Sequence, residues 1–322
     1  MVPLRRLGSS SLMVSPIGLG CWQFSQGQGF GGGYWSILSD DEIRDIIRAS
    51  LQGGTNWFDT AESYGGGRSE QVLARALKTL GKTSGDVVIA TKWMPVFRTA
   101  GSILKTIEKR TDNLAGFRID LYQIHHPYSF SSIQAQMRAM ARLVERQKIR
   151  FIGVSNFSAE RMRTTQRALA DFGLPLVSNQ VRYSLLDRRI ETNGVLAAAR
   201  ELGITIIAYS PLAQGILSGK FHRDPELIRT RSGPRKWMPA FRRRGLAKSR
   251  PVVAALEEIA AAHDATASQA ALSWLLQANQ GEVVVIPGAT SVAQAEENAR
   301  AARVALRDDE RARLEQLSRP FR

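Results

Sequence analysis

Four side chains that can carry charge or transfer a proton lie at, or just beyond, the ends of predicted β-strands. Asp59 ends one apolar run, and Tyr64 follows five residues later within FDTAESYGGG (58–67). Lys92 and His125 end the next two apolar runs, each about one strand-plus-helix unit further along the chain. If these strands are parallel neighbours in one sheet, their carboxyl ends would present these groups side by side. We therefore expect the four side chains to share a site.

The chemistry of this set is proton donation to an oxygen that is gaining negative charge. A free tyrosine has a pKa near ~10, and a nearby ammonium group, here Lys92, is expected to lower it by stabilising the phenolate. Asp59 would supply the counter-charge that keeps Lys92 protonated. A neutral His125 could donate a hydrogen bond that orients a carbonyl oxygen. The natural partner of such a set is hydride delivery to a carbonyl, with Tyr64 as the general acid.

Structural roles are the alternative for each of these residues. Asp59 could cap a turn, Tyr64 could be a surface aromatic, Lys92 an edge residue and His125 a core histidine. Their joint occurrence at strand ends on a barrel's functional rim favours the chemical role. We find no nucleophile with its own base, and no metal triad is predicted because the chain has only four histidines.

The elements that must position these groups alternate between strand and helix. The apolar runs are nearly continuous, as in parallel strands covered on both faces. Helical periodicity predicts helices over 40–54, 69–82, 102–116, 131–148, 158–173, 192–203, 251–276 and 291–302. The predicted strands are Pro16–Trp22, Thr55–Thr60, Val87–Lys92, Ile119–His125, Arg150–Ser155, Val177–Val181, Ile204–Tyr209 and Val283–Pro287.

Eight such repeats predict one α/β domain over residues 1–322, a (β/α)8 TIM barrel. Residues 1–17 are expected to form a short hairpin that plugs the barrel floor, with Gly8 and Ser9 in the turn. A long loop follows the seventh strand. An open, doubly wound sheet is the alternative architecture.

A glycine-rich run, GQGFGGG (27–33), formally matches the dinucleotide-binding pattern G-x-G-x-x-G at Gly27, Gly29 and Gly32. That motif requires a helix to open within it, whereas the next predicted helix begins only near Asp40. We interpret the run as a loop after the first strand.

The charge and composition exclude several classes of protein. The formal net charge of the chain is +15. Residues 220–250 hold eleven Lys and Arg against two acidic residues, so this stretch alone carries a charge of +9. A local patch suits an anionic small ligand or a solvated loop better than a nucleic acid. A lone cysteine, the absence of a long apolar segment and the lack of a signal sequence predict a cytoplasmic protein without membrane insertion.

Motifs along most of the chain strongly resemble the aldo-keto reductases. They are FDTAESYGGGRSE, ATKW, DLYQIHH, IGVSNF, SNQVRYSLLDR, AYSPLAQGILSGK and IPGATSVAQAEEN, and the resemblance runs from about Leu7 to Asn298. It implies a TIM barrel that uses a nicotinamide dinucleotide without a Rossmann domain. By this similarity Tyr64 is the acid, Lys92 and Asp59 tune it, and His125 orients the carbonyl.

The resemblance also implies a cofactor site. Ser155, Asn156 and Gln180 match positions that hold the carboxamide, and Tyr209 matches the aromatic that stacks on the nicotinamide ring. The remaining implied cofactor residues include the pyrophosphate loop and the adenine end. They are Cys21, Trp22, Asp59, Ser210, Leu212, Gln214, Gly215, Lys220, Arg231, Gly288, Thr290, Ser291, Gln294, Glu297 and Asn298.

Two departures from the family pattern stand out. No Lys or Arg lies among Gly288–Gln294, where many members bind the 2′-phosphate of NADP, although Ser291 and Gln294 equally fit a helix capping box. His126 replaces a tryptophan that relatives often carry, which predicts a more polar substrate pocket. The candidate pocket residues are Trp22, Phe24, Trp93, His126 and Tyr128.

The sequence therefore predicts a cytoplasmic, NADPH-dependent reductase of an aldehyde or ketone, with NADH the less favoured cofactor and no metal. The substrate is a small carbonyl compound, with a pyridoxal-like or sugar aldehyde as candidates. The alternative is a non-catalytic, dinucleotide-binding redox sensor or regulatory subunit of the same fold. No nucleic-acid or membrane partner is expected, and monomer and homo-oligomer stay open.

Overall fold

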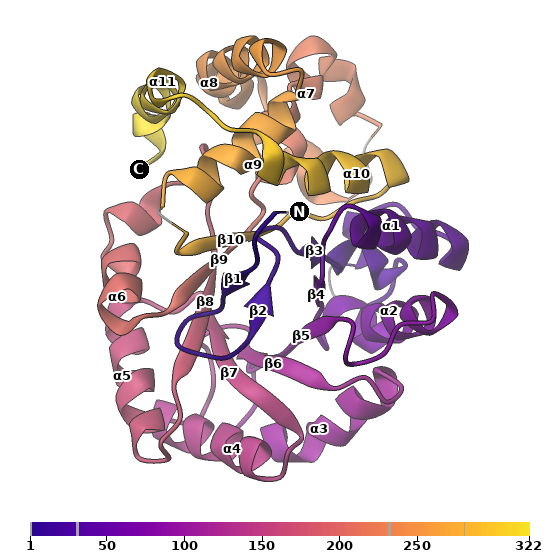
Figure 1. Cartoon of the computed structure of the whole chain (residues 1–322), viewed down its shortest axis with the longest axis vertical. Coiled ribbons are helices and arrows are strands. Elements are labelled where there is room, and N and C mark those ends of the chain that lie inside the picture. The colour runs from indigo at the N-terminus through magenta and orange to yellow at the C-terminus, as the bar shows by residue number, and fades with distance from the viewer. Residues whose placement is uncertain (1, 30–31, 231–232, 280) are drawn as a thin grey trace.

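One sheet of eight parallel strands lies at the centre of the fold (Figure 1). The computed structural model describes residues 2–29, 32–230, 233–279 and 281–322. Each strand of the sheet pairs with the next one in the sequence, in the order β3 to β10. The strands are β3 (Leu19–Gly20), β4 (Trp57–Asp59), β5 (Val88–Trp93), β6 (Ile119–Ile124), β7 (Ile149–Ser155), β8 (Leu176–Arg182), β9 (Thr205–Tyr209) and β10 (Val283–Ile286).

The first and last strands close the sheet into a barrel. Parallel bridges join Ile17 to Val285 and Gly20 to Gly288. A side chain at Gly20 would lie 2.8 Å from the carbonyl oxygen of Ile286, so the seam needs glycine there. The (β/α)8 prediction is confirmed, and the open doubly wound sheet is wrong.

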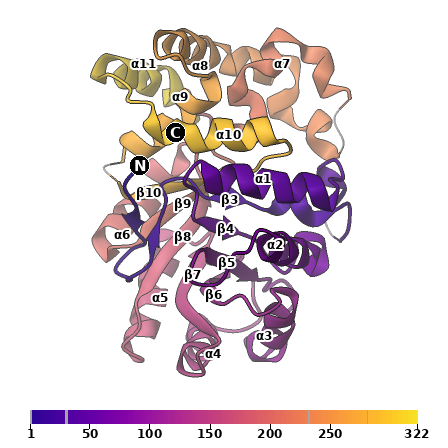
Figure 2. The same cartoon turned by 45° about the vertical axis from the view of Figure 1, so that its right-hand side comes forward.

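Helices surround the barrel, as both views show (Figures 1 and 2). Their buried faces are apolar, and no helix in the described part of the chain is long and apolar enough to cross a membrane. The helices are α1 (Asp40–Gln52), α2 (Arg68–Thr79), α3 (Gly101–Asn113), α4 (Ile133–Glu145), α5 (Ala159–Ala170), α6 (Val195–Leu202), α7 (Lys220–Arg223), α8 (Arg243–Ala262), α9 (Ala267–Gln277), α10 (Val292–Arg300) and α11 (Asp308–Ser318).

The single helix predicted over 251–276 is wrong. The chain leaves α8 through Asp264, whose φ is +48°, and restarts as α9 behind a capping box formed by Thr266 and Gln269. Helix α11 was not predicted, and it is held to the end of α8 by a bond of 2.8 Å between His263 Nε2 and Glu310 Oε2.

The N-terminal hairpin plugs the barrel floor, as predicted. Strands β1 (Arg5–Arg6) and β2 (Met13–Val14) pair antiparallel, and in Figure 1 the hairpin lies across the middle of the ring of strands. Its buried residues Leu7, Leu12 and Val14 pack in the same cluster as inward-facing residues of the barrel strands. This end of the barrel is closed by apolar contact, which leaves the carboxyl ends of the strands as the open face.

The loop after β9 contains short helical turns rather than a long helix. They are η5 (Ala213–Ser218), η6 (Pro225–Ile228), η7 (Pro234–Trp237) and η8 (Pro239–Phe241). A small apolar cluster holds η5, η6 and η8 to the start of α8, and its buried members are Ile216, Phe221, Ile228, Phe241 and Leu246. The loop therefore has its own core beside the barrel mouth.

Candidate active site

Lys92 connects two of the other predicted catalytic residues. Its Nζ donates to Asp59 Oδ1 at 2.5 Å and to the carbonyl oxygen of Thr60 at 2.8 Å, and lies 3.2 Å from the hydroxyl of Tyr64. The side chains of Lys92 and Asp59 are fully buried, at 0% and 1% exposure. The ammonium group is thus shared between a carboxylate and a phenol.

The second oxygen of Asp59 is also satisfied. Asp59 Oδ2 accepts from Gln123 Nε2 at 3.1 Å and from Gln180 Nε2 at 2.8 Å. A buried carboxylate with three such donors is held in one orientation. Gln180, which the family resemblance assigned to the cofactor carboxamide, therefore uses its amide Nε2 to hold Asp59.

Tyr64 lies on a tight turn after β4. Gly65 and Gly66 follow it with φ of +64° and +65°, and a side chain at Gly65 would lie 2.4 Å from the carbonyl oxygen of Ser25. The Tyr64 ring stacks against Trp22 at 6.2 Å between centroids and meets the edge of His125 at 5.7 Å. The structure thus brings the four predicted groups together at one place.

The pKa of Tyr64 differs from the sequence-based expectation. Burial raises the pKa of the phenol, and the Lys92 ammonium opposes this shift without reversing it, so the pKa lies above its ordinary value. The expectation of a lowered pKa was wrong because it ignored the loss of water around the hydroxyl. The phenol is therefore a protonated acid at neutral pH.

The pKa values of Lys92 and His125 shift in opposite directions. Burial alone would lower the pKa of Lys92, but attraction to Asp59 and Tyr64 outweighs it, and the pKa is raised. For His125, burial together with the charge of Lys92 and the proximity of His126 holds the pKa well below its usual range. The site therefore contains a charged ammonium and a neutral imidazole.

A network of buried charges supports the turn that carries Tyr64. Glu62 accepts from the Met94 backbone N–H at 2.5 Å and from Arg110 at 2.7 Å, and it also pairs with Arg98. Arg110 lies on α3, is 3% exposed and reaches Glu70 of α2 at 3.0 Å. Sequence reasoning missed this network. We name the set Glu62, Glu70, Arg98 and Arg110 the charged frame.

A cavity of about 1100 Å³ opens above the four residues. Tyr64, Asp59 and His125 line it, and most of the predicted cofactor residues do so too. The lining residues from that prediction are Cys21, Trp22, Asp59, Ser155, Asn156, Gln180, Tyr209, Ser210, Leu212, Gln214, Gly215, Lys220, Gly288, Thr290, Gln294, Glu297 and Asn298.

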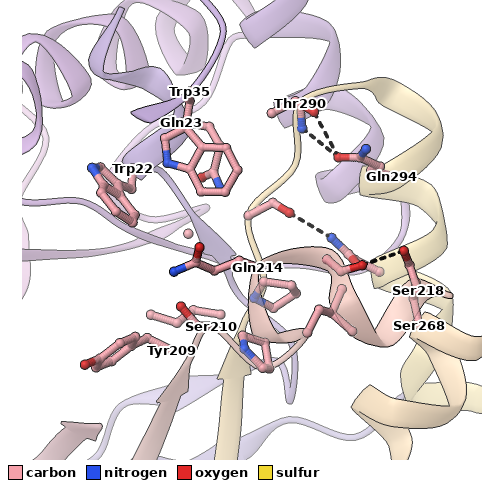
Figure 3. A pocket seen from close by; sticks show the side chains of 18 of the residues that line it. Trp22, Gln23, Trp35, Tyr209, Ser210, Gln214, Ser218, Ser268, Thr290 and Gln294 are labelled. Atoms are coloured by element: carbon pink, nitrogen blue, oxygen red, sulfur yellow. Dashed lines mark hydrogen bonds between the residues drawn. The ribbon is translucent and has the colours of Figure 1, made fainter. Parts of the chain in front are cut away.

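Two predicted cofactor residues are not among the residues that line the cavity. Arg231 lies outside the described residues. Ser291 caps α10, where its Oγ accepts from the Gln294 backbone N–H at 3.3 Å. The capping box is incomplete because the Gln294 side chain accepts from Thr290 instead (Figure 3).

The predicted substrate pocket is only partly right. Trp22 and His126 line the cavity. Phe24 and Trp93 do not line it, because both are 0% exposed and belong to the apolar core. Tyr128 is 70% exposed and stacks on the outer side of His126, at 6.3 Å between ring centroids.

The two loops that flank the cavity meet across it. Tyr34, in the segment after β3, donates its hydroxyl to Gln214 Oε1 at 3.0 Å, and Arg235 of η7 lies 4.3 Å from the ring centroid of the neighbouring Trp35. We name these four residues the strap. In Figure 3, Trp22, Gln23 and Trp35 come from one side of the cavity, and Ser210 and Gln214 come from another. Sequence reasoning missed Gln23, Tyr34 and Trp35.

The backbone after β9 suits a bound anion. Ser210, Ala213, Gln214 and Gly215 have φ of +50°, +47°, +58° and +95°. Ser210, Leu212, Gln214 and Gly215 all line the cavity, and turns that contain left-handed residues can present backbone N–H groups to an anion. Together with Lys220 on the cavity wall, this segment fits the pyrophosphate of a dinucleotide.

Polar groups at the ends of β7 and β9 suit an amide-bearing ring. Tyr209 donates its hydroxyl to Asn156 Oδ1 at 3.0 Å, which fixes the tyrosine ring beside the amide. Ser155 and Asn156 line the cavity next to it. An aromatic face with adjacent amide and hydroxyl groups fits a nicotinamide.

Comparisons with known proteins agree with this site. An uncharacterized oxidoreductase of Mycobacterium tuberculosis is 39% identical over 309 residues, which cover 96% of this chain and 91% of the relative. The chloroplastic pyridoxal reductase of Arabidopsis thaliana is 32% identical over 325 residues, covering 97% and 86%. The structure of glycerol dehydrogenase from Gluconobacter oxydans has a TM-score of 0.83 and 27% identity, covering 98% and 95%.

The family model of the aldo/keto reductases matches residues 16–319. The closed barrel, the four gathered side chains and the oxidoreductase relatives are consistent with that match. The chain therefore belongs to the aldo/keto reductase family and is an oxidoreductase that acts on carbonyl or alcohol groups.

Proposed function

We propose that this protein reduces an aldehyde or ketone to the alcohol with NADPH as hydride donor and Tyr64 as general acid. The observation that carries the proposal is the position of the buried Lys92 between Asp59 and Tyr64, both of which line the cavity. An ammonium 3.2 Å from the phenol favours the phenolate that remains after the proton has left.

When bound, the reduced nicotinamide supplies a hydride to the carbonyl carbon. As the C=O bond becomes a single bond, Tyr64 donates its phenolic proton to the oxygen, and the new C–H and O–H bonds complete the alcohol. Lys92 stabilises the phenolate until it takes a proton from solvent. His125, neutral and 5.7 Å from Tyr64 between ring centroids, orients the carbonyl oxygen by a hydrogen bond.

Each end of the cofactor has a candidate binding segment. Tyr209, Ser155 and Asn156 would hold the nicotinamide end, and the left-handed backbone 210–215 with Lys220 would hold the pyrophosphate. Glu297 and Asn298 would lie along the adenosine. The strap would lie across the bound cofactor and shield it from water.

The preference for NADPH over NADH rests on Thr290, Gln294 and the N-terminus of α10. Backbone N–H groups at a helix start, together with hydroxyl and amide donors, can bind a phosphate without a Lys or Arg. We expect a lower KM for NADPH than for NADH. A lower KM for NADH would contradict this part of the proposal and leave the chemistry of Tyr64 intact.

The substrate is proposed to be a small aldehyde, with a pyridoxal-like compound as the first candidate. The pyridoxal reductase of Arabidopsis thaliana is 32% identical to this chain, which motivates that choice. His126 gives the pocket a neutral polar ring, because burial and the charge of Lys92 lower its pKa. A sugar aldehyde is the second candidate to assay.

The test compares Tyr64→Phe with Tyr128→Phe, a change of the same size at an exposed tyrosine that does not line the cavity. Loss of a positioned general acid lowers rates by about 10²- to 10⁴-fold. We expect that loss in the single-turnover rate of NADPH oxidation for Tyr64→Phe only, with the Kd for NADPH within about twofold. Reduction by Tyr64→Phe as fast as by the parent would overturn the proposal.

A further inference from the structure

A second cavity, of about 290 Å³, adjoins the catalytic one. Both are lined by Arg182, Ser210, Gln214 and Met238, so these residues form the wall between the two spaces. We name the second cavity the annex. It adjoins the cleft between the nicotinamide end, where Arg182 pairs in register with Tyr209, and the turn 210–215, which contributes Ser210 and Gln214.

The annex walls are largely apolar. Leu186 follows β8, Ile216 and Phe241 belong to the core of the loop after β9, and Phe321 comes from the C-terminal end of the chain. The carbonyl oxygen of Phe321 accepts from the Arg188 backbone N–H at 2.7 Å, which fixes this wall. An apolar space that is already formed stabilises a ligand by removing its apolar surface from water.

The charges around the annex are mostly positive. Arg182 is exposed, and among the described residues no carboxylate lies within ion-pair distance of it; its guanidinium lies 5.8 Å from the Tyr209 ring centroid. Lys248 is a second cation on the wall. The wall carboxylate, Asp187, is neutralised by Arg189 at 2.7 Å. The annex therefore presents cations and apolar surface together.

We propose that the annex receives the far part of the carbonyl substrate and that Arg182 binds an anionic group on it. The substrate class is then a carbonyl compound with an apolar body and a carboxylate or phosphate, and Arg182 is a specificity-determining residue. An arginine binds a carboxylate through paired, charge-assisted N–H donors, which a neutral isostere cannot match. This inference rests on the proposed carbonyl reduction at Tyr64.

The first test compares 4-carboxybenzaldehyde with its methyl ester, which has the same ring and aldehyde but no charge. For the parent we expect a higher kcat/KM on the acid than on the ester. In Arg182→Gln the acid-to-ester ratio should fall by about tenfold, the range of a hydrogen bond to a charged group. The matched control, Arg242→Gln, removes the same charge from an exposed position that lines neither cavity.

A ratio that is unchanged in Arg182→Gln, or that falls equally in Arg242→Gln, would overturn the assignment of Arg182. No preference of the parent for the acid would overturn it as well. If the parent reduces neither compound and no other aldehyde, the proposed function has failed rather than this inference. The two failures are therefore distinguishable.

The second test concerns the apolar space. Ala240 lines the annex and not the catalytic cavity, so Ala240→Phe narrows the annex alone. We expect a larger loss of kcat/KM on 6-formyl-2-naphthoic acid than on 4-carboxybenzaldehyde, because the longer body needs that space. Equal losses on both acids would show that the substrate does not extend into the annex.

Discussion

The two walls of the active-site cavity are built differently. Asp59, Lys92 and Glu62 are buried, and each is bonded to partners from at least two elements. Across the cavity, the four residues of the strap lie on loops and short turns, and they are joined by a hydrogen bond from Tyr34 to Gln214 and by the stacking of Arg235 on Trp35. Buried charge pairs allow one arrangement only, whereas a few contacts between loops can open.

From this contrast we infer that the two walls have different roles, one in the chemical step and the other in the exchange of cofactor. The wall with Tyr64 and the charged frame fixes the geometry of the chemical step, where errors of about 1 Å are costly. The strap must let a dinucleotide enter and leave. Substitutions in the first wall should therefore change the rate of hydride transfer and the stability, and substitutions in the strap should change the exchange of cofactor.

The largest effect is expected for Lys92→Met. It removes the cation that stabilises the phenolate, so the hydride-transfer rate should fall by about 10²-fold or more. It also leaves Asp59 charged and buried without its cation, which should cost about 3–5 kcal/mol in the free energy of unfolding. Single-turnover absorbance and urea denaturation measure the two quantities.

A double variant separates the two roles of Lys92. Asp59→Asn combined with Lys92→Met removes both buried charges, so stability should recover while activity should not. Lys148→Met is the matched control, because Lys148 pairs with Glu108 at an exposed site, where loss of an ion pair costs less than about 1 kcal/mol. Recovery of activity in the double variant would show that the ammonium is not needed for the chemistry.

A smaller loss is expected for Glu62→Gln in the charged frame. The amide cannot accept from Met94, Arg98 and Arg110 as the carboxylate does, so the turn bearing Tyr64 should shift. We expect kcat to fall by about tenfold with the KM for NADPH nearly unchanged, because small misplacements affect the reacting geometry most.

Glu108→Gln, at an exposed position on helix α3, which also carries Arg110, should leave kcat unchanged. Glu62→Asp should recover part of the loss because it restores a carboxylate. If kcat and the KM for NADPH changed together in Glu62→Gln, the frame would support the whole cavity rather than the position of Tyr64.

The same contrast explains what sequence reasoning could predict. Apolar runs locate strands, and a barrel places strand ends at one mouth, so Asp59, Lys92 and His125 were expected to meet. Partners that lie on surrounding helices leave no such signal: Arg110 reaches Glu62 from 48 residues away, and Tyr34 meets Gln214 across 180 residues. These contacts depend on how helices and loops pack, which periodicity does not specify.

Two sequence-based predictions were wrong, one on where a helix begins and one on the direction of a pKa shift. The Thr-x-x-Gln pattern at Thr266 and Gln269 marks the start of α9, and it was hidden by a helical periodicity that continues from α8. The pKa of Tyr64 was misjudged because the attraction of Lys92 is visible in the sequence whereas the burial of the hydroxyl is not. Desolvation is a property of the folded cavity alone.

A moderate effect, on the rate at which NADPH dissociates, is expected for a substitution in the strap. Tyr34→Phe removes the hydroxyl that bonds to Gln214 and contacts Met238. Loss of one hydrogen bond, with a net contribution of about 0.5–1.5 kcal/mol, corresponds to about two- to thirteenfold faster dissociation of NADPH. Stopped-flow fluorescence of bound NADPH measures that rate, with Tyr128→Phe as the control. Unchanged dissociation would mean that the strap does not limit cofactor release.

The smallest expected effect is that of pH. The pKa of Tyr64 is raised, so the phenol stays protonated and able to donate through neutral pH and beyond its ordinary value of 10.0. The pKa of His125 is depressed well below 6.5, so the imidazole stays neutral as the pH falls toward 6. The single-turnover rate of reduction should therefore vary by less than about twofold between pH 6.5 and 9, and fall only at more alkaline pH as the acid is lost. A decline centred between pH 7 and 9 would mean that the phenol is deprotonated far more easily than its burial allows, and that the attraction of Lys92, rather than desolvation, sets its acidity.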